Sequence, residues 1–94
     1  DLADFICFAL KNFEALPEVM NVGSGVEVSV KEMHQHMAKI TGYTGELNHD
    51  LDKPVGRLRR YLDLHHQQRL GWSPKTPFEE ALAITYDYLR GTLE

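Results

Sequence analysis

Cationic side chains gather in one short stretch of the sequence, DKPVGRLRRYLD, at residues 52–63. Three of the chain's five arginines, Arg57, Arg59 and Arg60, fall within four residues there. Lys53 lies just upstream. A guanidinium group can give two parallel hydrogen bonds to phosphate oxygens, so arginine suits the binding of a diphosphate. The stretch is therefore a candidate anion-binding segment.

A simpler alternative is a solvated loop in which the cations pair with nearby acidic residues. Pro54 and Gly56 favour a turn, and Asp50, Asp52 and Asp63 flank it. Exposed ion pairs contribute only about 0–1 kcal/mol to stability, so stability alone gives little reason for the cluster. The residues by themselves leave both interpretations open.

The other motifs of the chain carry less chemistry. NVGSGVEV, at 21–28, supplies Gly23 and Gly25 of a dinucleotide fingerprint, but Val28 stands where the third glycine belongs. That glycine allows close packing of helix on strand, so a tight turn is the better interpretation. There is no G-x-S-x-G elbow and no tyrosine followed four residues later by lysine. We therefore predict no catalytic residue and no cofactor site on this chain.

Histidine spacing does not favour a metal site. His34 and His36 are two residues apart on an expected helix, which directs them about 200° apart. His65 and His66 also diverge, and the single Cys7 provides no cysteine pair. We expect solvated histidines, a buried thiol at Cys7 and, from the lone cysteine, a reducing cytoplasm.

Composition limits the classes of protein. The chain has 94 residues and a net charge of −4, which fits one small globular domain and argues against a general nucleic-acid binder. Its longest apolar run, FICFAL, is too short to span a membrane. Because the chain begins with Asp1 and not Met, we expect a piece of a longer protein.

Periodicity and capping signals predict an α/β fold, with four helices and two or three short strands in a small layer. Ser29 and Glu32 form a capping box before one helix, and Gly42 can end it. Thr76 is the expected N-cap of the last helix, and Gly91 its end. The expected helices are 2–13, 30–41, 64–69 (capped by Asp63) and 77–91, and the expected strands are 19–22, 44–49 and 61–63.

Three segments together resemble one enzyme family. DLADFICFAL is similar to the V-D-D-L-A helix of the extended short-chain dehydrogenase/reductases, and NVGSGVEVSVKEM to their N-x-G-S-G-x-E-x-S-x-x-E segment. DKPVGRLRRYLD, the following LGWSPKTPFEEAL and TYDYL resemble the tail of the GDP-L-fucose synthase family. The resemblance implies that residues 1–94 are a C-terminal substrate-binding lobe that lacks its Rossmann domain.

The resemblance also implies a function for the longer enzyme. That family epimerises and reduces GDP-4-keto-6-deoxymannose with NADPH, and its Tyr-x-x-x-Lys and NADP site lie in the N-terminal Rossmann domain. This chain is then inactive alone. Its expected partners are the nucleotide sugar and the missing Rossmann domain, and a homodimer stays open.

Matched by position, the resemblance assigns five substrate-binding residues. Arg60 occupies the place of the family's substrate-contacting lysine, and Arg59 matches the family's arginine. Lys53 also matches, whereas Arg57 replaces a small residue. Val55 stands where the family has a substrate-binding aspartate, so the identity of the nucleotide sugar is open. The alternatives are a free-standing interaction module that uses the apolar helix 2–13, and a small enzyme that uses the histidines.

Overall fold

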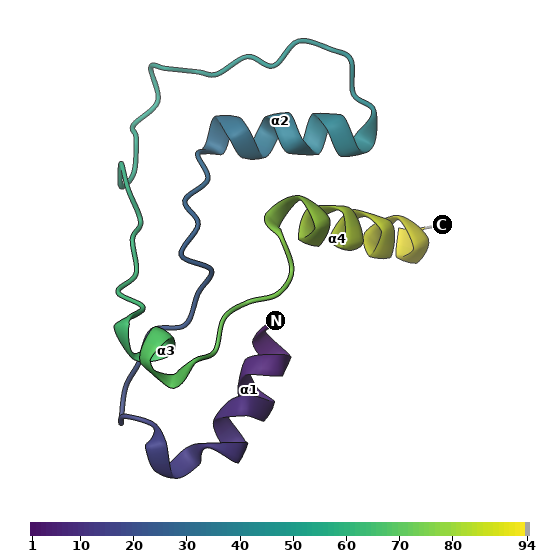
Figure 1. The fold of residues 1–94 in the computed structure, drawn as a ribbon. Coiled ribbons are helices and arrows are strands. Elements are labelled where there is room, and N and C mark those ends of the chain that lie inside the picture. The colour runs from purple at the N-terminus through teal and green to yellow at the C-terminus, as the bar shows by residue number, and fades with distance from the viewer. Residues whose placement is uncertain (94) are drawn as a thin grey trace. The chain divides into compact units, whose positions relative to one another are not determined.

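The computed structural model describes residues 1–93, and four α-helices and one short 3-10 helix form within them (Figure 1). The chain divides into two compact units. The first unit is Asp1–Glu27 with Arg59–Thr76, and the second is Val28–Leu58 with Pro77–Glu94. The elements are α1 (Leu2–Lys11), the 3-10 helix η1 (Phe13–Ala15), α2 (Val30–Thr41), α3 (His65–Leu70) and α4 (Phe78–Leu93).

The predicted α/β fold is wrong, because no residue from 1 to 93 forms a strand. The segments 19–22, 44–49 and 61–63 are irregular. A strand exists only when a neighbouring backbone completes its hydrogen bonds, and a short ribbon of two strands is marginal in water. An apolar pattern can predict an extended segment, but it does not supply the partner. The prediction of four helices is confirmed.

Polar contacts between distant residues hold α1 in the first unit. The indole Nε1 of Trp72 donates to Oδ2 of Asp4 at 2.9 Å, and the Phe5 ring meets the Trp72 ring edge-on at 5.1 Å between centroids. The Asp1 carboxylate accepts hydrogen bonds from the backbone of Lys75 and Thr76. Asp1 is thus the N-cap residue of α1, but its side chain binds the segment 75–76 and makes no cap hydrogen bond.

A buried glutamine of α3 binds the turn formed by residues 23–25, called the Gly23 turn below. Gln67 is only 3 % exposed, and its amide accepts from the Gly23 N–H at 3.0 Å and donates to the Gly23 carbonyl at 2.9 Å. The Gln67 side chain therefore satisfies both backbone groups of Gly23, as the backbone of a neighbouring strand would. α3 begins at His65 with Leu64 as its N-cap residue, so the predicted start at residue 64 and the predicted cap by Asp63 are wrong. The Asp63 carboxylate nevertheless accepts a hydrogen bond from the His65 N–H at 3.0 Å.

Local signals define the second unit. The capping box of Ser29 and Glu32 is present, and Gly42 ends α2 in the left-handed conformation with φ 71°, as predicted. α2 packs against α4, and the two helices lie side by side in Figure 1. The prediction that Gly91 ends the last helix is wrong, since α4 continues to Leu93. A glycine inside a helix costs only about 1 kcal/mol, which the neighbouring turns can offset.

Large apolar side chains remain uncovered within the described residues. α1 and α4 have no buried residue. Leu2 is 68 % exposed and Leu10 71 %, and the predicted buried thiol of Cys7 is also exposed. Leu64 and Trp72 are the buried apolar residues of this part of the chain. The apolar stripe of α1 therefore predicts a buried face, but these residues do not provide the surface that would cover it.

Candidate functional site

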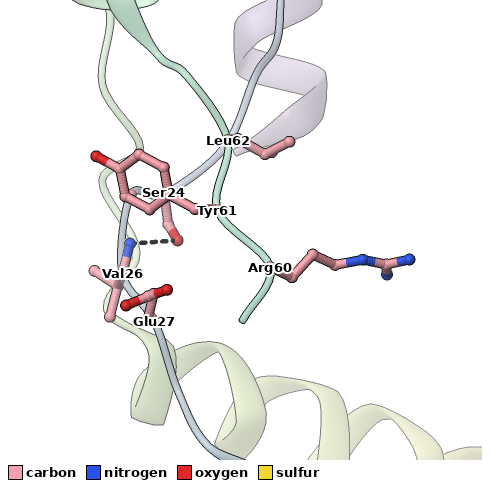
Figure 2. Close-up of a pocket in the computed structure, with 7 residues that line it drawn as sticks. Ser24, Val26, Glu27, Arg60, Tyr61 and Leu62 are labelled. Carbon is pink, nitrogen blue, oxygen red and sulfur yellow. Dashed lines mark hydrogen bonds between the residues drawn. The ribbon is translucent and has the colours of Figure 1, made fainter. Parts of the chain in front are cut away.

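A shallow pocket of the first unit lies where two segments distant in sequence meet. One wall is the turn after Gly23 and the other is the end of the arginine-rich stretch (Figure 2). Gly25 has φ 71°, a conformation that glycine adopts at little cost, so it lets the turn reverse beside the second segment. The lining residues are Ser24, Gly25, Val26, Glu27, Arg60, Tyr61 and Leu62.

Two backbone N–H groups of the G-S-G turn are hydrogen-bonded within the protein. The Gly23 N–H is bound to Gln67, and the Val26 N–H is bound to the Ser24 hydroxyl at 3.2 Å. A dinucleotide fingerprint uses free backbone N–H groups at such a turn to hold the pyrophosphate. With these donors occupied and Val28 in the third glycine position, the turn does not fit a dinucleotide.

Arg59 is bound to an acidic residue of the turn. Its Nε donates to Oε1 of Glu27 at 3.2 Å, and one terminal nitrogen donates to Oε2 of the same carboxylate. This hydrogen-bonded pair lowers the pKa of Glu27 and raises the pKa of Arg59. Both groups are therefore charged at neutral pH, and Glu27 locally neutralises Arg59.

Arg60, the next residue, has a different environment. Figure 2 shows its side chain extending away from Ser24 and Glu27, on the other side of its backbone segment. Among the described residues of the first unit, no carboxylate pairs with Arg60. The Tyr61 ring lies over the turn instead (Figure 2). Arg60 thus presents an uncompensated guanidinium at the rim of the pocket.

The other three predicted site residues belong to the second unit and are all exposed. Nζ of Lys53 lies 4.0 Å from Oδ2 of Asp50, which agrees with the solvated-pair alternative for that residue. Val55 is 75 % exposed. Arg57 is exposed as well. The structure therefore brings Arg59 and Arg60 to the Gly23 turn, while Lys53, Val55 and Arg57 lie in the part of the chain assigned to the other unit.

Sequence reasoning missed two residues that shape this site. Glu27 stands in the family-like N-x-G-S-G-x-E segment, but no role follows from the motif alone. Gln67 lies in a polar stretch, HHQQR, that indicates an exposed helix. For Glu27, the sequence does offer a signal: an acidic residue in a turn, in a chain that also holds a cluster of arginines.

The histidines show no metal site within residues 1–93. No group of three or more His, Cys, Asp and Glu residues is placed there to hold a metal ion. His36 is not simply solvated as expected, because its Nδ1 lies 3.0 Å from Oε1 of Glu79 and its ring packs edge-on against Phe78. The His34 ring lies 5.6 Å from the ring of His49.

None of the helices in the described part of the chain has the length and apolar character needed to cross a membrane.

Curated proteins of similar sequence are GDP-sugar enzymes. Over 88 residues, 94 % of this chain, it is 40 % identical to a probable GDP-L-fucose synthase 1 of Oryza sativa subsp. japonica. It is 39 % identical over the same share to a GDP-L-colitose synthase of Yersinia pseudotuberculosis. A GDP-L-fucose synthase of Escherichia coli is 37 % identical over 79 residues. The chain spans 25 % to 29 % of the length of these relatives.

Solved structures agree with these relatives. A GDP-6-OMe-4-keto-L-xylo-heptose reductase of Campylobacter jejuni matches 98 % of the chain with a TM-score of 0.87 and 26 % identity, and the match covers 29 % of that protein. A GDP-mannoheptose C4 reductase of the same organism, solved with NADP bound, has a TM-score of 0.82 at 24 % identity and supports the fold alone.

No protein-family model matches the chain. The motif resemblance is nevertheless confirmed by the individual relatives, which extend over almost the whole chain and share one type of activated sugar in their names. The chain is homologous to a C-terminal part of the GDP-L-fucose synthases.

Proposed function

We propose that this chain is the substrate-binding lobe of a longer enzyme that epimerises or reduces a GDP-sugar, and that its cationic stretch holds the diphosphate. The observation that carries the proposal is the similarity over 94 % of the chain to enzymes named for GDP-linked sugars. The exposed guanidinium of Arg60 supports it, because a diphosphate needs cationic donors that no carboxylate already occupies.

In this proposal the lobe binds the substrate and does not perform the chemistry. Within residues 1–93, the Gly23 turn lacks the third glycine of a dinucleotide fingerprint, and the N–H groups of Gly23 and Val26 are already hydrogen-bonded. NADP is therefore assigned to another domain of the longer enzyme, which would also carry the catalytic residues. The positive charge of the stretch in the sequence comes from Lys53, Arg57, Arg59 and Arg60.

The cytoplasmic location stays a prediction from the single cysteine.

Val55 leaves the sugar itself open. A valine cannot accept a hydrogen bond from a sugar or a base, whereas the aspartate expected from the family resemblance could. We expect Val55→Asp to change the ratios of kcat/KM among GDP-sugars, measured on the complete polypeptide.

Kinetics of the complete polypeptide that contains this lobe tests the proposal. Arg60→Ala should raise the KM for the GDP-sugar by about 10- to 100-fold, because a charge-assisted hydrogen bond contributes about 1.5–3 kcal/mol. It should leave the Kd for NADPH unchanged. Arg69→Ala removes an exposed arginine outside the stretch and is the matched control. An unchanged KM for every GDP-sugar tested would reject the assigned role of the stretch.

A second candidate function follows from the uncovered face of α1. Ile6 is 51 % exposed and Leu10 71 %, which fits an interaction module as well as a lobe that docks on its own enzyme. Sedimentation of the 94-residue chain separates the two. A stable homodimer without affinity for GDP would favour the interaction module.

A further inference from the structure

Two adjacent arginines of the cationic stretch differ in what they bind. Two nitrogens of Arg59 donate to the two oxygens of the Glu27 carboxylate. Arg60 has no acidic partner in the described part of its unit. A bidentate pair of this kind fixes both the distance and the plane of a guanidinium group. The orientation of Arg59 is therefore set by the protein itself.

Arg60 points away from the carboxylate that binds Arg59. In an extended backbone, successive side chains point to opposite sides. Arg59 reaches Glu27, and Figure 2 shows the Arg60 side chain extending away from Glu27, on the other side of its backbone segment. The contact joins residues 32 apart in sequence, so it also fixes where the cationic stretch runs along the Gly23 turn.

Charge assigns different roles to the two arginines. The carboxylate of Glu27 stands beside Arg59 and would repel a second anion there. A diphosphate that approached Arg59 would have to displace or face this carboxylate. Arg60 offers its donors without that repulsion.

We infer that Glu27 is a positioning residue for the nucleotide-sugar site: it anchors Arg59, and this anchor directs Arg60 to the diphosphate. The inference rests on the proposed function only for the identity of the anion. The anchor itself is a property of the first unit and can be measured without any ligand.

Charge reversal distinguishes an anchor from a ligand. Glu27→Gln removes the ion pair, and the double variant Glu27→Arg with Arg59→Glu restores it in reverse. The first readout is the order of the backbone N–H groups of residues 59–62 in the 94-residue chain, measured as NMR order parameters. The second is the Kd for GDP of the complete polypeptide. Glu46→Gln, a substitution of an exposed glutamate outside the site, is the matched control.

The anchor predicts a defined pattern. Glu27→Gln should lower the order parameters at 59–62 and weaken GDP binding by about two- to tenfold, because ordering a mobile side chain costs about 0.5–1.5 kcal/mol, and that cost falls on binding once the anchor is lost. The reversed pair should restore the order parameters and return the Kd to within about twofold of the original value. Arg60→Ala should weaken GDP binding more than Glu27→Gln does.

Opposite results would overturn the inference. If Arg59 touches the diphosphate directly, the reversed pair places a carboxylate on the anion and GDP binding collapses although the order parameters recover. Unchanged order parameters in Glu27→Gln would show that no anchor exists. If the original polypeptide does not bind GDP, the proposed function fails, and the order parameters alone then decide whether Glu27 holds the stretch.

Discussion

Contacts between residues distant in sequence shape the first unit, whereas contacts between neighbouring residues define the ends of α2 in the second unit. In the first unit, Gln67 binds Gly23 across 44 residues, and Trp72 binds Asp4 across 68. In the second unit, Ser29 and Glu32 cap α2 across three residues, and Gly42 ends the same helix. Side chains close in sequence define α2, whereas distant side chains define the path of the backbone around α1 and α3.

This difference explains where sequence patterns succeed. A capping box or a terminal glycine acts within one helical turn, so its effect does not depend on the rest of the fold. A buried amide that satisfies a distant backbone depends on the whole unit. The first unit should therefore lose its structure after a single long-range change, whereas the two ends of α2 should respond to local changes.

The largest expected effect comes from Trp72, which is 7 % exposed. Trp72→Ala removes the contact with Phe5 and the hydrogen bond to Asp4, and we expect a loss of about 3–5 kcal/mol, typical of a buried aromatic residue. Amide exchange should accelerate throughout α1 while α2 keeps its protection. Trp72→Phe keeps most of the ring contact and is the milder control. Persistent protection of α1 in Trp72→Ala would remove the distinction between the units.

Gln67 is expected to have the next largest effect. Gln67→Leu leaves the N–H and the carbonyl of the half-buried Gly23 without protein partners. A fully buried unsatisfied group costs about 1–3 kcal/mol, so we expect a loss near the lower end of that range. Chemical denaturation of the chain measures this loss. Gln68→Leu changes the neighbouring exposed glutamine and controls for the change in hydrophobicity. Equal stabilities of the two variants would contradict the role assigned to Gln67.

Ser29→Ala tests the local side of the comparison. It removes the side-chain oxygen that accepts from the Glu32 N–H, and loss of such a cap costs about 1 kcal/mol. Faster amide exchange should be confined to the first turn of α2, and Ser29→Thr should largely restore the cap. An effect that spreads into the first unit would mean that the units are not independent.

The smallest expected effect is a loss of stability at acidic pH. Hydrogen bonds from Trp72, Arg59 and Ser29 lower the pKa values of Asp4, Glu27 and Glu32 respectively. A folded pKa below the unfolded value means that the stabilisation is present above about pH 4 and is lost as the pH falls through the folded pKa. Carboxyl titration by NMR should give a midpoint below the ordinary aspartate value of about 3.9 for Asp4. For Glu27 and Glu32, the midpoints should lie below the ordinary glutamate value of about 4.3. Ordinary midpoints would contradict these contacts.

In the candidate site, as in the fold, local sequence predicts some features and long-range contacts decide others. The sequence identified Arg59 and Arg60 as cationic residues of one stretch, and the family resemblance treated both as substrate ligands. The pairing of Arg59 with Glu27 depends on the return of residues 59–62 to the Gly23 turn, which no local pattern encodes. Two adjacent residues of the same type thus have different environments, because only one of them meets Glu27.

The sequence by itself determined the four helices, the cap and end of α2, and the relationship to GDP-sugar enzymes, because helix signals are local and motifs persist along the chain. Tertiary structure alone decided that the extended segments form no sheet, that Gln67 is buried against Gly23 and that Glu27 holds Arg59. Each of these depends on which backbone lies beside another, and that is set by contacts between residues more than 30 positions apart.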